Sequence, residues 1–182
     1  MRRWIAAATL FLAALAAPVV ALAETAFDFT FEKLEGGELP LADFKGKALL
    51  VVNTASFCGF TGQYEGMVTI WERYRDKGLV VIGVPSDDFN QEPGSAAEIK
   101  EFCELTYGVD FPMANKTHVI GPEAHPFYRW AAATLGADKV PTWNFHKYLV
   151  SPEGQLVAAW SSLTGPTSAG LTDTIEMVLP RP

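Results

Sequence analysis

Two apolar runs of strand length, with a helical pattern between them, constrain the fold of this chain most strongly. The runs are 48–52 (Ala-Leu-Leu-Val-Val) and 79–84, and continuous apolar runs of this length are typical of strands buried on both faces of a sheet. Between them, apolar side chains recur at the spacing of an amphipathic helix: Tyr64, Met67, Trp71 and Tyr74. Gly78 is placed to end that helix. The unit predicts two parallel strands joined by a right-handed crossover.

The rest of the chain adds further elements of the same kinds. They are an alternating strand at 27–31, a helix that starts with a capping box at Ser95 and ends at Gly108, strands at 147–150 and 156–160, and a short helix at 172–179. The closing pair of strands, separated by a turn, predicts an antiparallel hairpin. The order predicts an α/β protein with a mixed central sheet and helices on both faces, which is a thioredoxin-like fold.

The N-terminus has the features of a secretory signal peptide. Arg2 and Arg3 precede an apolar run at 4–20, and 21–23 (Ala-Leu-Ala) has the small-x-small pattern of a cleavage site. The alternative is an uncleaved anchor, but about 17 residues is at the lower limit for spanning a bilayer. We therefore expect a signal peptide at 1–23, a single thioredoxin-like domain at 24–182 and export, with the bacterial periplasm as the compartment.

The charge of the chain argues against two classes of partner. The full chain carries 14 basic and 21 acidic residues, a net charge of −7. Removal of 1–23 takes away two arginines and no acid, which leaves 12 basic against 21 acidic residues and a net charge of about −9. We expect no nucleic-acid partner and no stable membrane insertion after cleavage.

Only two cysteines are present, Cys58 and Cys103. In an exported protein, a structural disulfide between them is one interpretation. Cys58, however, lies between a buried strand and the start of a helix, where unpaired N–H groups and the helix dipole favour a thiolate. A thiolate there could attack a peroxide and become a sulfenic acid. Thr61 stands where a dithiol exchange enzyme would have its second cysteine, so single-cysteine chemistry is favoured.

Four sequence blocks in order resemble the cysteine-containing branch of the glutathione peroxidase family. The blocks are 53–64 (Asn-Thr-Ala-Ser-Phe-Cys-Gly-Phe-Thr-Gly-Gln-Tyr), 84–95, 115–126 and 143–150 (Trp-Asn-Phe-His-Lys-Tyr-Leu-Val). The resemblance extends over roughly 27–160. The resemblance implies a thioredoxin-like fold and reduction of hydrogen peroxide and organic or lipid hydroperoxides.

The resemblance also implies a catalytic tetrad. Its members fall on Cys58, Gln91, Trp143 and Asn144. The indole N–H and the two amides are neutral donors that would stabilise a thiolate and bind a peroxide oxygen. The motif holds no histidine or carboxylate base.

Two departures from the family pattern bear on this assignment. The segment between Pro85 and Gln91 is one residue shorter than usual and contains Asp87 and Asp88, acids that would disfavour a thiolate if they faced it. The stretch 127–142 lacks the longer insertion of the tetrameric enzymes. This implies a monomer with a weak or absent glutathione site.

The role of Cys103 is open between two interpretations. On the apolar face of its helix it is either a buried structural thiol or a resolving cysteine that condenses with the Cys58 sulfenic acid. The reductant is then a thioredoxin-like protein or glutathione, used as a co-substrate with no bound cofactor.

His118, His125 and His146 show no metal-ligand spacing, and we expect no metal. The competing function is a non-catalytic thioredoxin-fold module of the envelope with a Cys58–Cys103 disulfide.

Overall fold

The structure is a computed structural model, which describes residues 24–181. The predicted signal peptide at 1–23 lies outside the described residues and stays a prediction. Within the described part, no helix is both long and apolar enough to cross a membrane.

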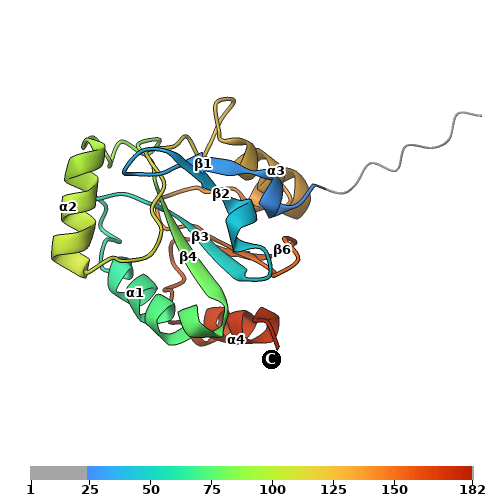
Figure 1. Cartoon of the computed structure of the whole chain (residues 1–182). Helices are drawn as coiled ribbons and strands as arrows, with labels where there is room; N and C mark the ends of the chain where they lie inside the picture. The colour runs from blue at the N-terminus through green and yellow to red at the C-terminus, as the bar shows by residue number, and fades with distance from the viewer. Residues whose placement is uncertain (1–23, 182) are drawn as a thin grey trace, which may run out of the picture.

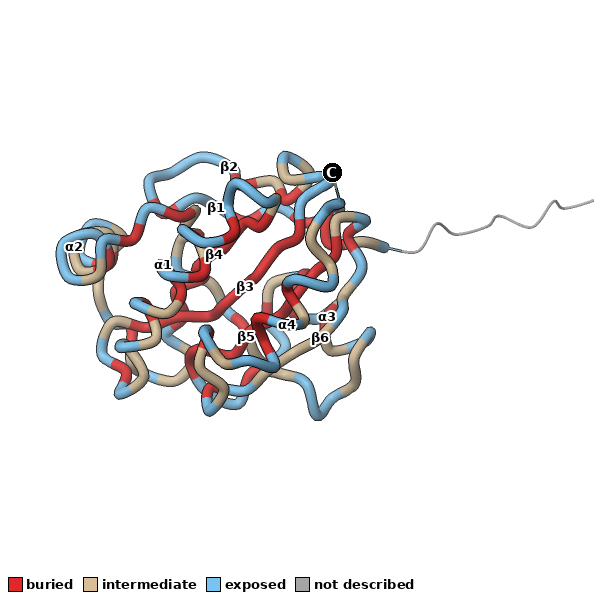
Figure 2. The backbone as a smooth tube through the Cα atoms, turned by 90° about the horizontal axis from the view of Figure 1, so that it is seen from below, coloured by how far each residue is buried: buried red, intermediate tan, exposed pale blue. Residues whose placement is uncertain are grey.

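A four-stranded mixed sheet forms the centre of the molecule (Figure 1), in the order β4-β3-β5-β6. β3 (Ala48–Thr54) pairs in parallel with β4 (Leu79–Pro85) and antiparallel with β5 (Lys147–Val150). β5 pairs in turn with β6 (Leu156–Trp160) in the predicted hairpin. Every residue of β3, β4 and β5 is buried, as the continuous apolar runs predict. The buried strands cross the middle of the molecule in Figure 2.

Helices cover both faces of this sheet, which confirms the thioredoxin-like α/β prediction. One core contains side chains of α1 (Gln63–Tyr74), α2 (Ala96–Tyr107) and α4 (Ala169–Val178). The core on the opposite face contains α3 (Pro126–Leu135) and the small hairpin of β1 (Thr30–Glu32) and β2 (Glu38–Pro40). Four short 3-10 turns complete the described chain: Ala26–Asp28, Leu41–Phe44, Arg75–Lys77 and Ala137–Lys139.

The predicted ends of α2 are confirmed by its caps. The Ser95 hydroxyl accepts a hydrogen bond from the Glu98 N–H, and the Glu98 carboxylate accepts one from the Ser95 N–H. Gly108 ends the helix with φ of 66°, a left-handed conformation that favours glycine. This helix carries Cys103, so the caps fix the position of the second thiol.

Two parts of the sequence prediction were wrong. α3 was not predicted, although Pro126 at its first position and the buried residues Phe127, Tyr128 and Ala131 fit a helix. The strand expected at 27–31 is only Thr30–Glu32, because the residues before it form a 3-10 turn in which Asp28 bonds back to Thr25.

Candidate functional site

Cys58 lies in the loop between β3 and α1, at the carboxyl end of the central strand. Its side chain is nearly buried, with 4% exposure. The backbone N–H of Phe60 points at the sulfur, with an N–Sγ distance of 3.4 Å. The carbonyl of Cys58 accepts a hydrogen bond from the Thr61 N–H at 3.1 Å, which closes the turn. The nearest donor to the sulfur is thus in the turn, because α1 itself begins only at Gln63.

Gln91 and Asn144 meet although 53 residues separate them. The Asn144 side-chain amide donates to the Gln91 side-chain oxygen at 3.1 Å. The Gln91 carbonyl accepts a hydrogen bond from the N–H of Phe57, the neighbour of Cys58, at 3.1 Å. The structure therefore brings the segments of three predicted site residues to one place.

Trp143 is the most exposed of the predicted site residues, at 39%. Its ring packs on that of Phe89 with a centroid distance of 5.5 Å. Phe89 belongs to the same loop as Gln91, so the aromatic contact and the Asn144–Gln91 bond join the same two segments.

Asn53 holds the Trp143–Asn144 segment against the end of β3. Its side-chain amide donates to the Trp143 carbonyl at 3.2 Å, and its side-chain oxygen accepts from the His146 N–H at 3.0 Å. Its backbone adds bonds to the carbonyl of His146 and the N–H of Phe145. Phe145 has a φ of 65°, an uncommon conformation for an aromatic residue. Sequence reasoning did not assign Asn53 to the site.

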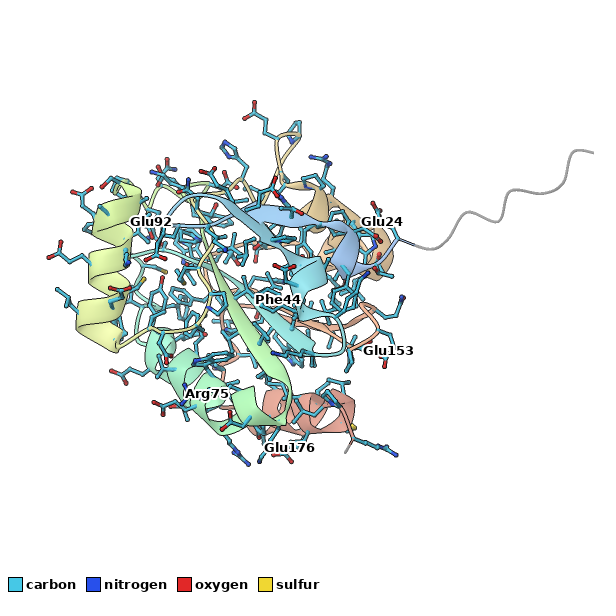
Figure 3. All side chains as sticks on the ribbon, in the orientation of Figure 1. Glu24, Phe44, Arg75, Glu92, Glu153 and Glu176 are labelled. Atoms are coloured by element: carbon cyan, nitrogen blue, oxygen red, sulfur yellow. The ribbon has the colours of Figure 1, made fainter. Side chains whose placement is uncertain are left out.

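Glu92 fastens the Gln91 loop to the Cys58 loop and was also missed. The buried carboxylate accepts hydrogen bonds from the N–H of Ser56 at 2.7 Å and from its hydroxyl at 3.0 Å. Burial raises the pKa of Glu92, and the two bonds from Ser56 oppose that rise. Figure 3 labels Glu92 near the start of α2.

The two acidic side chains that depart from the family pattern, Asp87 and Asp88, accept hydrogen bonds from groups other than the Cys58 loop. Asp87 accepts from the N–H of Glu92 at 2.9 Å. Asp88 accepts from the N–H groups of Val119 and Ile120 and lies 2.6 Å from His118 Nδ1. Burial would raise the pKa of Asp88, but these hydrogen bonds and the imidazole lower it below its usual value. The shorter loop is therefore fixed by its own carboxylates.

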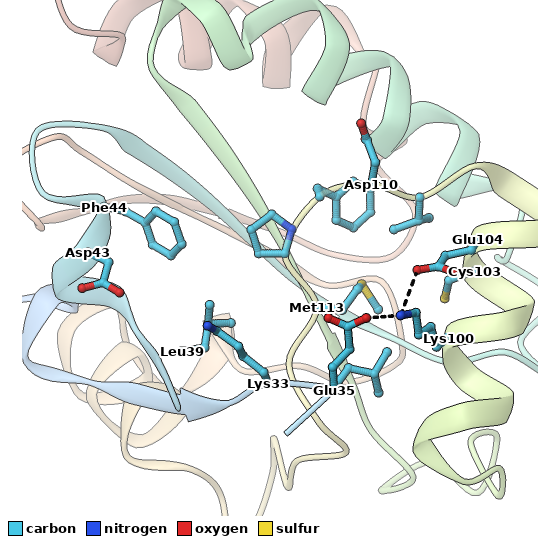
Figure 4. A pocket seen from close by; sticks show the side chains of 14 residues that line it. Lys33, Glu35, Leu39, Asp43, Phe44, Lys100, Cys103, Glu104, Asp110 and Met113 are labelled. Atoms are coloured by element: carbon cyan, nitrogen blue, oxygen red, sulfur yellow. Dashed lines mark hydrogen bonds and ion pairs between the residues drawn. The ribbon is translucent and has the colours of Figure 1, made fainter. Parts of the chain in front are cut away.

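Cys103 lies on the inner face of α2, in the same apolar core as Cys58, and both thiols are free. Burial raises the pKa of Cys103 to about 11, so its resting form is the thiol. Its helix borders a cavity of about 510 Å³ between α2, the β1–β2 hairpin and residues 109–113 (Figure 4), whose rim carries the ion pair of Lys100 with Glu35. The structure contains the proposed partner thiol but no disulfide.

The three histidines have separate surroundings. His125 caps α3 through the N–H of Phe127, and His118 pairs with Asp88 at the surface. His146 is buried, and its ring lies tilted against that of Tyr148 with a centroid distance of 4.7 Å. Across residues 24–181, no group of three or more His, Cys, Asp or Glu side chains could hold a metal ion.

Comparison with known proteins shows the family of the chain. The family model described as glutathione peroxidase matches residues 26–132. The chain belongs to the glutathione peroxidase family. One relative of this peroxidase, the hydroperoxy fatty acid reductase of Synechocystis, is 43% identical over 151 residues, which are 78% of this chain and 89% of the relative. The glutathione peroxidase-like peroxiredoxin of Schizosaccharomyces pombe is 41% identical over 157 residues, 84% of this chain and 98% of the relative.

Solved structures agree with this membership in the glutathione peroxidase family. The crystal structure of Trgpx in its apo form superposes with a TM-score of 0.70 at 32% identity, over 88% of this chain and 99% of that one. A thiol:disulfide interchange protein from Chlorobium tepidum superposes at 0.61 with 18% identity, over 87% and 99% of the two chains. The second similarity shows only the shared thioredoxin fold.

The buried His146 predicts acid-sensitive stability. Burial, with a smaller contribution from the charge of Lys147, lowers the pKa of His146 to about 4 from 6.5. As the pH falls from about 6.5 to about 4, His146 binds a proton in the unfolded chain but not in the folded chain. The free energy of unfolding therefore falls by up to about 3 kcal/mol. We expect His146→Gln to remove most of this loss, measured by urea unfolding at pH 7 and pH 4.5.

His118→Gln is the matched control for this measurement. The pKa of His118 is raised, chiefly by its bond to Asp88. Protonated His118 therefore adds to the free energy of unfolding at low pH, and this contribution is lost as the pH rises. We therefore expect the free energy of unfolding of His118→Gln to fall between pH 7 and pH 4.5 by at least as much as that of the unaltered protein. An equal acid loss in His146→Gln and the unaltered protein would contradict the prediction.

Proposed function

We propose that this family member is a thiol peroxidase that uses Cys58 to reduce hydrogen peroxide and organic or lipid hydroperoxides. The observation that carries the assignment is the meeting of three distant segments. The loop of Cys58, the loop of Gln91 and the Trp143–Asn144 segment are joined by direct hydrogen bonds. The proposed catalytic residues are Cys58, Gln91, Trp143 and Asn144.

In the proposed reaction, the Cys58 thiolate attacks one oxygen of the O–O bond. That bond breaks, the sulfur keeps the attacked oxygen as a sulfenic acid, and the other oxygen leaves with the electron pair. The leaving oxygen takes a proton and becomes water or an alcohol. The N–H of Phe60, already directed at Sγ, would stabilise the thiolate, and the amides and the indole would bind the peroxide oxygens.

The surroundings of the Cys58 loop support an apolar substrate. Phe57 is 70% exposed and borders a cavity of about 310 Å³, whose apolar wall includes Ile99 and Phe102. The Synechocystis relative is named for hydroperoxy fatty acids. An organic hydroperoxide could place its hydrocarbon part against these side chains.

We further propose that Cys103 regenerates Cys58. The Cys103 thiol would attack the sulfenic sulfur, form a disulfide and release water, and a thioredoxin-like protein would reduce that disulfide. Relatives from fission yeast and Chlamydomonas are named peroxiredoxins, which supports thiol-dependent recycling of this kind. Glutathione is the alternative reductant.

The central test is peroxide turnover by Cys58→Ser. The substitution replaces the nucleophile by a weakly acidic hydroxyl and should lower turnover of cumene hydroperoxide at least ~1000-fold, to the uncatalysed rate. The unaltered protein should also give a sulfenic acid at Cys58, detected by dimedone labelling and mass spectrometry. Undiminished turnover by the variant, or a permanent Cys58–Cys103 disulfide in the purified protein, would contradict the proposal.

Cys103→Ser separates the resolving role from a structural one. We expect this variant to form the Cys58 sulfenic acid at the unaltered rate but to lose thioredoxin-supported turnover by ~100-fold, because no intramolecular disulfide can form. A stopped-flow peroxide pulse and a coupled NADPH assay measure the two steps, with glutathione as the second donor. Full thioredoxin-supported turnover would leave Cys103 with only its packing role.

We also propose that the enzyme is exported to the periplasm and acts there as a monomer. Support comes from the charged, apolar and small-residue pattern of 1–23 and from the short segment at 127–142. Expression of the full chain in a Gram-negative host should give a periplasmic product that begins at Glu24 and has the mass of one chain by light scattering. A cytoplasmic product that retains Met1 would contradict the export proposal.

A further inference from the structure

Lys147 is a fully buried cation that the proposed chemistry does not use. It lies on β5, on the face occupied by α1, and its side chain is 0% exposed. Its ammonium donates to the side-chain oxygen of Gln63 and to the carbonyl of Thr164, the latter at 2.6 Å. Both acceptors are neutral.

A buried ammonium without an anionic partner is costly. Among the ion pairs of residues 24–181, none includes Lys147. Burial lowers the pKa of Lys147 to about 8, so the group still holds its proton at neutral pH. The charge is thus retained in the core with no carboxylate to balance it.

The hydrogen bonds of Lys147 lead toward Cys58. Gln63 is the first residue of α1, and its N–H donates to the carbonyl of Phe60 at 2.8 Å. The N–H of Phe60 in turn points at Cys58 Sγ. The ammonium is therefore connected to the sulfur through one side chain and one turn of backbone.

We propose that Lys147 is a positioning residue for Cys58, and that its buried charge makes the start of α1 more positive and favours the thiolate. Through Gln63 the ammonium fixes the turn whose N–H group meets the sulfur. In the poorly polarisable core this charge is weakly screened and acts over a longer distance than in water. The anion that would balance Lys147 is then the reactive thiolate itself. This inference rests on the proposed role of Cys58.

A purely structural role is the competing explanation. Gln63 and Lys147 also hold the carbonyls of Ser162 and Thr164, so the cluster could simply fasten this loop to α1. In that case, loss of the positive charge would change stability but not the ionisation of Cys58.

Other ionisable groups around the cluster must stay unchanged in the test. On β5 the neighbour is His146, which is neutral near pH 7 because its pKa is lowered. On α1 it is Tyr64, whose pKa is raised by burial. On the Cys58 side, Glu92 binds Ser56 and interacts with Asp87 and Lys116. β3, β6 and the loop at 161–164 contribute no charged side chain near Lys147.

The experiment measures the rate of Cys58 alkylation by iodoacetamide against pH, in a Cys103→Ser background. Lys147→Met removes the charge with similar volume, and buried ions often tolerate such replacement. We expect the midpoint of the pH profile to move up by about one pH unit, which lowers the thiolate fraction at neutral pH about tenfold. kcat/KM for peroxide should fall by a similar factor.

Gln63→Glu tests the same charge without removing the lysine. The introduced carboxylate can keep the bond to the ammonium while it cancels the positive charge, so the alkylation midpoint should also rise. Leu149→Ala, on the same strand and face, is the control for simple destabilisation and should leave the midpoint unchanged. If Lys147→Met does not fold, the alkylation midpoint of Gln63→Glu tests the inference in its place.

An unchanged midpoint in folded Lys147→Met or in Gln63→Glu would overturn the inference. A rise as large in Leu149→Ala would overturn it also, since the effect would then follow from loss of packing. These outcomes are distinct from failure of the proposed function, which would appear as peroxide turnover by Cys58→Ser.

Discussion

The site depends on the buried side chain of Asn53, which ties the end of the central strand to the segment that carries Trp143 and Asn144. Four hydrogen bonds join Asn53 to residues 143–146. A buried amide that lost these partners would cost about 1–3 kcal/mol for each unsatisfied group. The bonds also place the start of β5 beside the end of β3, so the sheet and the site share one connection. Cys58 follows five residues later, in the loop after this strand, whose position is already fixed.

Carboxylates complete the arrangement from the other side. Asp87, Asp88 and Glu92 each accept backbone N–H groups, and together they order the loop that carries Gln91. An acid near a reactive thiol would normally oppose its ionisation. Here one oxygen of each carboxylate accepts from the protein backbone, so the acidic loop acts mainly as a scaffold. The buried ammonium of Lys147 reaches the Cys58 turn by another route, through Gln63.

Much of the fold could be predicted because its strongest signals are local. The runs that became β3 and β4 are apolar throughout, and Ser95 and Gly108 mark the ends of α2 by cap chemistry. α3 was missed because its apolar residues are clustered and its start depends on His125, which is an unusual cap. The proposed nucleophile Cys58 was found from its place between a buried strand and a helix, whereas Gln91, Trp143 and Asn144 came from resemblance. Asn53, Glu92 and Lys147 could not be identified in this way, since their importance depends on partners 36 to 93 residues distant that only the folded chain brings close.

The left-handed backbone at Phe145 has a consequence for how this enzyme could be altered. A glycine would relax the conformation, yet the ring fills the core against Tyr64 at 5.2 Å and cannot be removed without a cavity. The position therefore requires both a left-handed backbone and a large buried ring, and no single residue type favours both. A substitution that relaxed this peptide unit would open a cavity in the core, whereas one that kept the ring would keep the unfavourable backbone conformation.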